Sequence, residues 1–243
     1  MYSLALALQD FVPVILGAIG IVAIVRLVRR EDPAAGQWAL LGAVLIVGGG
    51  LSRATWKLLN ALTGADVVPL FLALYVLLAT GYLLFAMALW HGWQTARDRH
   101  ARVAPWVPAL AALVLLLPAT ALLAPQGGRI LPLLWLFTAT AGSLVTSLIL
   151  TRWARGIGER RLAALFLANL VATLVLNGVA RSDNQGEAVQ WIAQLLNTVN
   201  QGAFMLAAVG LERAARGVRA RDPGSLVEDA LGADPRPEPV RHD

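Results

Sequence analysis

The fold of this chain is decided by the stretch Glu187–Glu212, which reads EAVQWIAQLLNTVNQGAFMLAAVGLE. As a helix this stretch is long enough to span a bilayer, and most of its side chains are apolar. Gln190, Gln194, Asn197 and Gln201 are spaced four, three and four residues apart, so a helix places them on one face. We call this face the amide stripe. Because amides in hydrocarbon are costly unless hydrogen-bonded, we expect it to meet neighbouring helices or a wet cavity.

The same apolar composition continues along the chain. Its 243 residues are 58% hydrophobic and 14% charged, with a mean hydropathy of +0.65, whereas a soluble domain carries roughly 25% charged residues. Apolar windows close to the length of a spanning helix recur along it. They are 9–28, 38–60, 67–90, 105–124, 130–151, 161–181 and 188–211. The sequence therefore predicts an all-α polytopic membrane protein with seven transmembrane helices.

Arginines give the predicted orientation. They are frequent in the loops after the first, third and fifth windows, for example Arg29, Arg97 and Arg155, and rare in the other loops. By the positive-inside rule the N-terminus lies outside and the C-terminus in the cytoplasm, in a membrane of the bacterial inner-membrane type. Residues 1–212 form the transmembrane domain. Residues 213–243 are basic and then rich in proline and acidic residues, which predicts a disordered cytoplasmic tail.

A weak internal similarity allows a duplicated arrangement. Val12-Pro13 and Leu131-Pro132 occupy similar places near the starts of the first and fifth windows. If the window 105–124 is a linker, helices 1–3 and 5–7 are triplets of the same orientation, a 3+1+3 pattern that transporters use. Chance similarity in a leucine-rich sequence is the alternative, and the sequence leaves both open.

Composition excludes several chemistries. The chain has no cysteine, so it forms no disulfide and holds no thiolate-ligated cluster. Its three histidines, His91, His100 and His242, lie in or beside polar segments and offer neither a pair of haem ligands nor a metal site within the membrane. The net charge of +5 is explained by arginines in loops. We therefore expect a lipid bilayer as partner, no nucleic acid and no cofactor.

The second window contains two cations four residues apart, Arg53 and Lys57, and Lys57 is the only lysine of the chain. Lys57 is expected near the outer boundary, where it can snorkel to water. Arg53 lies one turn deeper, where no Asp or Glu is expected at similar depth. It then needs amides such as Asn177 or Asn197, or an anion from outside.

Two further patterns near the membrane centre leave alternatives open. Asn169, Thr173 and Asn177 share one face of the sixth helix and are expected to pack against the amide stripe, either as hydrogen-bonded packing or as the wall of a ligand cavity. Gly48-Gly49-Gly50 allows either close helix packing or a locally unwound helix. The candidate ligand-binding residues are Arg53, Lys57, Tyr75, Asn177, Gln194, Asn197 and Gln201, with Tyr82 as a further lining residue.

Seven helices with this orientation resemble the microbial rhodopsins in topology. That resemblance implies a retinal-linked lysine in the last helix, one turn after an aspartate. The corresponding positions here are Asn197 and Gln201, which can neither form nor counter a Schiff base. The resemblance therefore extends to topology and not to the cofactor.

Three hypotheses for function remain. The first is a protein that binds or transports a small, anionic solute or lipid headgroup through an outward-facing polar cavity. The second is a non-catalytic structural or regulatory subunit, in which the amide stripe docks another membrane protein. The third is a lipid-modifying enzyme, for which the sequence offers no nucleophile and no acid–base pair. The sequence therefore favours a protein that is not an enzyme.

Overall fold

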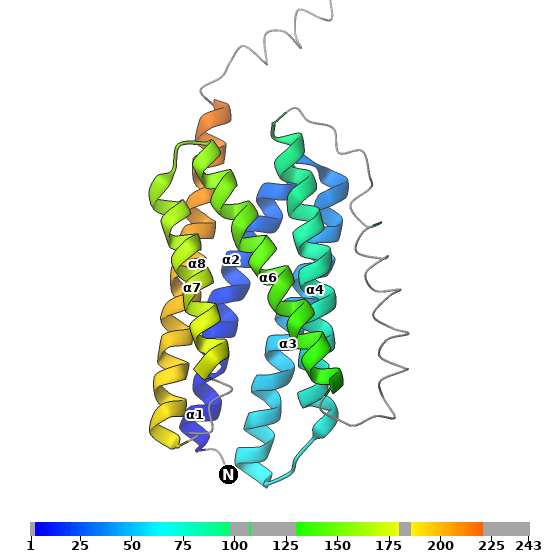
Figure 1. Ribbon diagram of the computed structural model, residues 1–243, viewed down its shortest axis with the longest axis vertical. Helices are drawn as coiled ribbons and strands as arrows, with labels where there is room; N and C mark the ends of the chain where they lie inside the picture. Colours follow the sequence, from blue (N-terminus) through cyan, green and yellow to red (C-terminus); the bar gives the residue numbers. More distant parts are fainter. Residues whose placement is uncertain (1–2, 98–106, 108–129, 180–185, 221–243) are drawn as a thin grey trace, which may run out of the picture.

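The computed structural model describes residues 3–97, 107, 130–179 and 186–220, and all regular structure among them is helical (Figure 1). The predicted all-α class is therefore confirmed for this part of the chain. The predicted helix 105–124 and most of the tail lie outside the described residues. The helices are α1 Leu4–Gln9, α2 Phe11–Glu31, α3 Pro33–Thr63, α4 Val68–Thr95, α6 Ile130–Gly156, α7 Arg160–Val179 and α8 Glu187–Ala220.

Within the described residues, four helical stretches are long and apolar enough to cross a membrane. They are Leu4–Glu31, which joins α1 and α2, then Pro33–Thr63, Val68–Thr95 and Leu133–Gly156. Their mean hydropathies run from 1.6 to 2.6. These helices indicate an integral membrane protein, while the count of seven spans and their orientation stay predictions.

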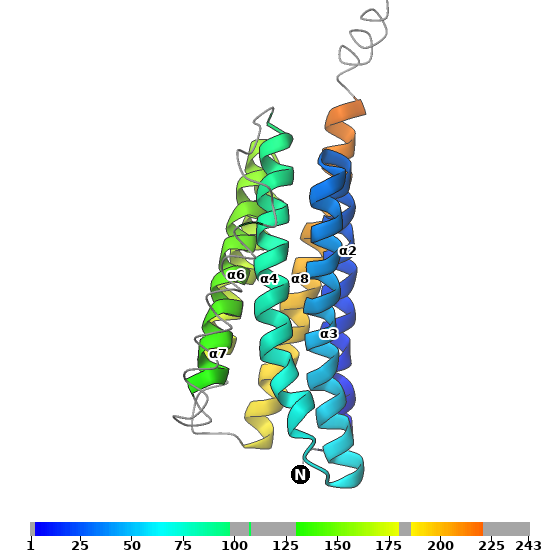
Figure 2. The ribbon, with the colours of Figure 1, turned by 90° about the vertical axis from the view of Figure 1, so that its right-hand side faces the viewer.

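Six helices form a closed ring. Each of α2, α3, α4, α6, α7 and α8 packs mainly on the next, and α8 returns to pack on α2. Figure 2 shows α2 and α3 on one side, α6 and α7 on the other, and α4 and α8 between them. α4 ends at one end of the ring, and α6 begins at the other (Figure 1).

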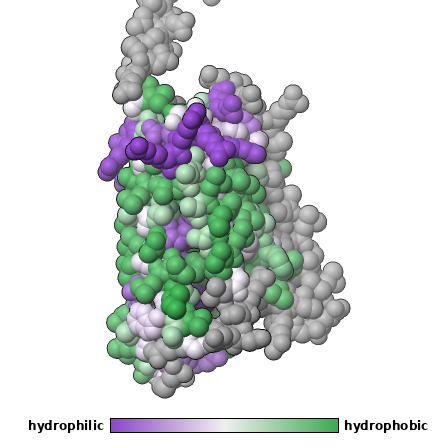
Figure 3. All heavy atoms as spheres, turned by 60° about the vertical axis from the view of Figure 1, so that its left-hand side comes forward, coloured by the Kyte–Doolittle hydropathy of each residue, from purple (hydrophilic) through white to green (hydrophobic). Residues whose placement is uncertain are grey.

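The two ends of the ring differ in charge. Arginines at the ends of α2, α6 and α8 and at the start of α7 gather at one end, which we call the arginine-rich end. Figure 3 shows a hydrophilic belt there, with mainly hydrophobic surface below it. Large apolar side chains such as Val199 and Leu206 are 71% and 63% exposed on this outer surface. Such a surface fits a lipid environment.

The ends of α3 follow from local sequence. Asp32 caps its first turn by accepting a hydrogen bond from the Ala35 N–H at 2.9 Å, and Pro33 occupies the first helical position. At the other end Gly64 adopts a left-handed conformation with φ of 71°. The glycine thus ends α3 between the predicted windows 38–60 and 67–90.

Glycines let α3 and α4 approach closely. A Cβ on Gly42 would lie 2.8 Å from the carbonyl oxygen of Gly81, so a larger residue would force the helices apart. Gly48-Gly49-Gly50 lies inside α3, which is helical without interruption from Pro33 to Thr63. A Cβ on Gly50 would approach Val14 of α2 at 3.1 Å. The close-packing interpretation is confirmed, and the unwound-helix alternative is wrong.

The arginine-rich half of the ring has a densely packed core. Leu89, Leu150, Phe166 and Leu211 are at most 1% exposed and belong to one continuous cluster contributed by every helix of the ring. At its edge Glu212 of α8 is buried and forms ion pairs with Arg30 of α2 and Arg216 of α8. These contacts tie α2 to α8.

Candidate functional site

The other half of the ring encloses a cavity of about 380 Å³. All six ring helices contribute to its wall, together with Asp10 at the junction of α1 and α2. Towards the arginine-rich half the cavity ends at Phe85 and Phe204, which pack with the core cluster. Pro13 and Gly17 line it on α2, where the packed half has Ile24 and Val28.

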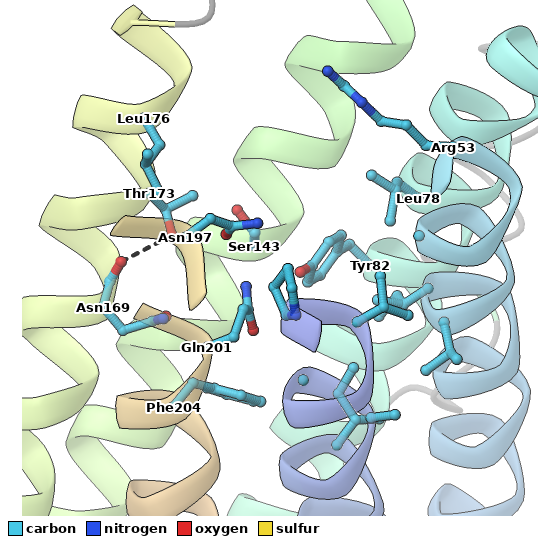
Figure 4. A pocket seen from close by; sticks show the side chains of 18 of the residues that line it. Arg53, Leu78, Tyr82, Ser143, Asn169, Thr173, Leu176, Asn197, Gln201 and Phe204 are labelled. Carbon is cyan, nitrogen blue, oxygen red and sulfur yellow. Dashed lines mark hydrogen bonds between the residues drawn. The ribbon is translucent and has the colours of Figure 1, made fainter. Parts of the chain in front are cut away.

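The amide stripe faces this cavity along most of its length. Gln194, Asn197 and Gln201 line the wall, and Figure 4 shows Asn197 and Gln201 reaching from α8 into the space that Tyr82 faces from α4. Ile192 and Leu195 on the opposite side of α8 are 58% and 53% exposed. The predicted orientation of the stripe towards the bundle is confirmed for these three amides, while their role in ligand binding stays a prediction.

A different amide joins α7 to α8. Asn169 Nδ2 donates to Asn200 Oδ1 at 2.9 Å, and Asn200 Nδ2 donates to Thr173 Oγ1 at 3.2 Å. Asn200 does not belong to the amide stripe, so packing and cavity wall use different faces of α8. Asn169 and Thr173 thus bond to Asn200 rather than to the stripe, and both line the cavity beside the stripe, as the second of the two alternatives expected. The side chain of Asn177 lies outside the described residues.

Arg53 lines the cavity from α3. Figure 4 shows its side chain extending from α3 at the end of the cavity where Leu176 lies. Among the residues that the structure describes, none forms a hydrogen bond or ion pair with its guanidinium group. The cavity therefore contains a permanent cation with unused donors.

Lys57 has a different environment from the one predicted. Its Nζ lies 2.5 Å from Asp10 Oδ2, and both residues are only 6% exposed. The expectation that Lys57 snorkels to water is therefore wrong. The first helical stretch begins at Leu4 rather than near residue 9, which places Asp10 inside the bundle beside Lys57. Asp10 lines the cavity and Lys57 does not.

Tyr75 is not part of the cavity wall. Its ring packs against Phe71 with centroids 5.4 Å apart, and it contacts the small cluster around Trp135 and Ala139. Tyr82, two turns along α4, lines the cavity instead. It packs closely on α6, because a Cβ on Gly142 would lie 2.8 Å from Tyr82 Cβ.

Sequence reasoning missed the wall that α6 provides. Ser143, Thr146 and Ser147 line the cavity, and their spacing of three and four residues was the signal that could have identified them. Thr146 Oγ1 is buried and has no hydrogen-bond partner in the described part of the chain. Buried hydroxyls are normally satisfied, so this group has bonding capacity left for a molecule inside the cavity.

The charges of the wall leave the cavity electropositive. Asp10 is neutralised by Lys57, whereas Arg53 has no carboxylate partner among the side chains described. Within the same residues, no three His, Cys, Asp or Glu side chains come together as a metal site would require. The arrangement offers one guanidinium group, three amides and several hydroxyls to a solute.

No family model, no curated protein and no solved structure matches this chain.

Proposed function

We propose that the protein binds a small organic anion in the ring cavity as the first step of carrying it across the membrane. The observation that supports this most directly is Arg53, an arginine in the cavity wall that has no hydrogen bond or ion pair to the residues that the structure describes. An arginine keeps its charge at any accessible pH, and an unpaired charge at this depth is costly. Its planar donors suit two-point contact with a carboxylate or phosphate.

The remaining wall supplies hydrogen bonds for an uncharged part of the same solute. Gln194, Asn197 and Gln201 offer both donors and acceptors, and Thr146 has an unsatisfied hydroxyl. The volume of about 380 Å³ falls within the range of about 300–1,000 Å³ for small-molecule pockets. It corresponds to roughly a dozen water molecules at about 30 Å³ each. A short polar carboxylate or phosphate ester is of this size.

The direction of entry follows from the positive-inside rule. The arginine-rich end is assigned to the cytoplasm, so the half of the ring that contains the cavity faces the outside. Phe85 and Phe204 separate the cavity from the cytoplasmic half. The solute thus enters from outside, and passage to the cytoplasm requires the packed half to rearrange, as alternating access demands.

The other two hypotheses have less support. A subunit role required the amide stripe to dock a neighbouring protein, but Gln194, Asn197 and Gln201 line the cavity rather than the outer surface. A lipid-modifying enzyme requires an activated nucleophile. In the described wall the one carboxylate, Asp10, is held by Lys57 rather than by a serine or threonine.

The proposal is tested by measuring solute binding to the purified protein and to Arg53 variants. Thermal shift and native mass spectrometry with a panel of small carboxylates and phosphates should identify a stabilising anion. Hydrogen bonds to charged groups contribute about 1.5–3 kcal/mol, so Arg53→Gln should weaken binding on the order of tenfold or more. Arg53→Lys should weaken it too, since lysine lacks the planar fork.

Arg152→Gln is the matched control, because Arg152 is exposed on α6 away from the cavity wall. It should leave binding unchanged. If no anion binds, or if Arg53→Gln and Arg152→Gln have equal effects, the proposed function is wrong. Uptake of the identified anion into proteoliposomes then separates transport from binding alone.

A further inference from the structure

A second hollow lies on the outer surface of the ring, between α2 and α8 at the arginine-rich end. Its volume is about 510 Å³, and it shares only Ala18 with the lining of the cavity. This groove is independent of the proposed solute site. It combines an apolar wall with a charged end.

The apolar wall runs along one line of α2. Ile15, Ile19 and Val22 line the groove at spacings of four and three residues, and they are 56%, 46% and 45% exposed. The line leads to Arg26, one turn further on. From Ile15 to Arg26 the helix rises about 16 Å, a length that a single acyl chain can follow.

The charged end of the groove has an excess of arginine. Arg26, Arg213 and Arg216 face one carboxylate, Glu212. Glu212 is already bonded to Arg216 and to Arg30. Arg26 and Arg213 have no hydrogen bond or ion pair within the described chain. Two exposed guanidinium groups without a partner in the described chain therefore lie at the end of an apolar groove, at the arginine-rich end of the ring.

We propose that this groove binds an anionic diacylphospholipid of the surrounding bilayer. Its phosphate group lies against Arg26 and Arg213, which suit two-point contact with phosphate oxygens. One acyl chain lies along Ile15, Ile19 and Val22. Charge complementarity selects the headgroup, because basic pockets between transmembrane helices favour anionic lipids. The lipid contacts both α2 and α8, the two helices that the Glu212–Arg30 ion pair joins.

The test compares lipids that share their acyl chains and differ in charge. Native mass spectrometry of the full chain measures the retention of dioleoylphosphatidylglycerol against dioleoylphosphatidylcholine. The wild type should retain the anionic lipid preferentially. The double variant Arg26→Gln/Arg213→Gln should lose that preference by on the order of tenfold or more, since each arginine near the surface contributes about 1 kcal/mol.

The matched control is Arg152→Gln/Arg161→Gln, which removes the same charge from exposed positions of α6 and α7 at the same end. It should keep the preference. Ile19→Trp fills the apolar wall without changing charge and should also reduce retention, which keeps the test decisive if the double arginine variant does not fold. Equal loss in the control pair, equal retention of both lipids by the wild type, or equal binding of glycerol 3-phosphate without acyl chains would each overturn the proposal.

Discussion

The two halves of the ring are built from the same helices but use them differently. In the arginine-rich half, α8 contributes Ala207, Ala208 and Leu211, all fully buried in the core cluster. Nearer its start, the same helix contributes Gln194 and Gln201 to the wall of a cavity. The difference shows that a single helix can pack the bundle together in one half and present hydrogen-bonding groups to a cavity in the other.

The physical basis of this difference is that no hydrophobic driving force brings helices together in lipid. Association then depends on close packing and on interhelical hydrogen bonds. The packed half satisfies the first condition, with Phe166 and Leu150 among its fully buried side chains. The hollow half depends instead on a few polar contacts, the Asp10–Lys57 pair and the bonds of Asn200. Substitutions should therefore have different consequences in the two halves.

The largest effect is expected from breaking the Asp10–Lys57 ion pair. Removing one partner leaves the other charge buried and uncompensated, which costs about 3–5 kcal/mol. Lys57→Met and Asp10→Asn should each lower the free energy of unfolding in detergent micelles by this amount, and the double variant should lose less than the sum. Arg216→Gln is the control, because Arg216 is 54% exposed and Glu212 keeps Arg30. A loss below 1 kcal/mol in both single variants would mean that the pair does not stabilise the hollow half.

The packed half is tested by a matched pair of leucines. Leu211→Ala removes a fully buried side chain from the core and should cost about 2 kcal/mol or more. Leu170→Ala removes a side chain that already borders the cavity, so fewer contacts are lost. Thermal unfolding of both variants measures the difference. Equal losses would show that the cavity wall is packed as tightly as the core.

Substitutions at two glycines, Gly142 and Gly17, should distinguish a rigid part of the cavity wall from an adaptable part. Gly142→Ala places a Cβ 2.8 Å from Tyr82 Cβ and should cost about 1–3 kcal/mol by overpacking. Gly17→Ala places a Cβ 3.0 Å from Gln201 Oε1, the flexible end of a side chain that can move aside. It should change the melting temperature little and narrow the cavity. A stable Gly142→Ala protein would mean that α4 and α6 are free to separate at this point.

The sequence predicted the helices well because each depends on local composition. The apolar windows could be identified because a spanning helix needs a long apolar run. The site was harder. The pairing of Lys57 with Asp10 was missed because a helix start shifted by a few residues changes which charges meet across the bundle. Tyr75 and Tyr82 share a helix face, and only their depth, which depends on how α4 packs on α6, decides which one reaches the cavity.

The smallest effect distinguishes two asparagines on neighbouring faces of α8. Asn200 bonds Asn169 and Thr173, whereas Asn197 lines the cavity and has no hydrogen bond within the described residues. Interhelical bonds of this kind contribute about 0.6–2 kcal/mol in membranes. Asn200→Leu should therefore lower the free energy of unfolding by about that amount. Asn197→Leu removes no hydrogen bond to the described residues and should leave stability unchanged, while it weakens anion binding because the solute loses a partner. The two variants make the same Asn→Leu change one helical turn apart. The changes in helix propensity and in side-chain hydrophobicity are therefore the same in both, and the difference in stability reports the hydrogen bonds.

If Asn197→Leu destabilises the fold as much as Asn200→Leu, the amide stripe is structural, and the contrast between a packed and a binding half no longer holds.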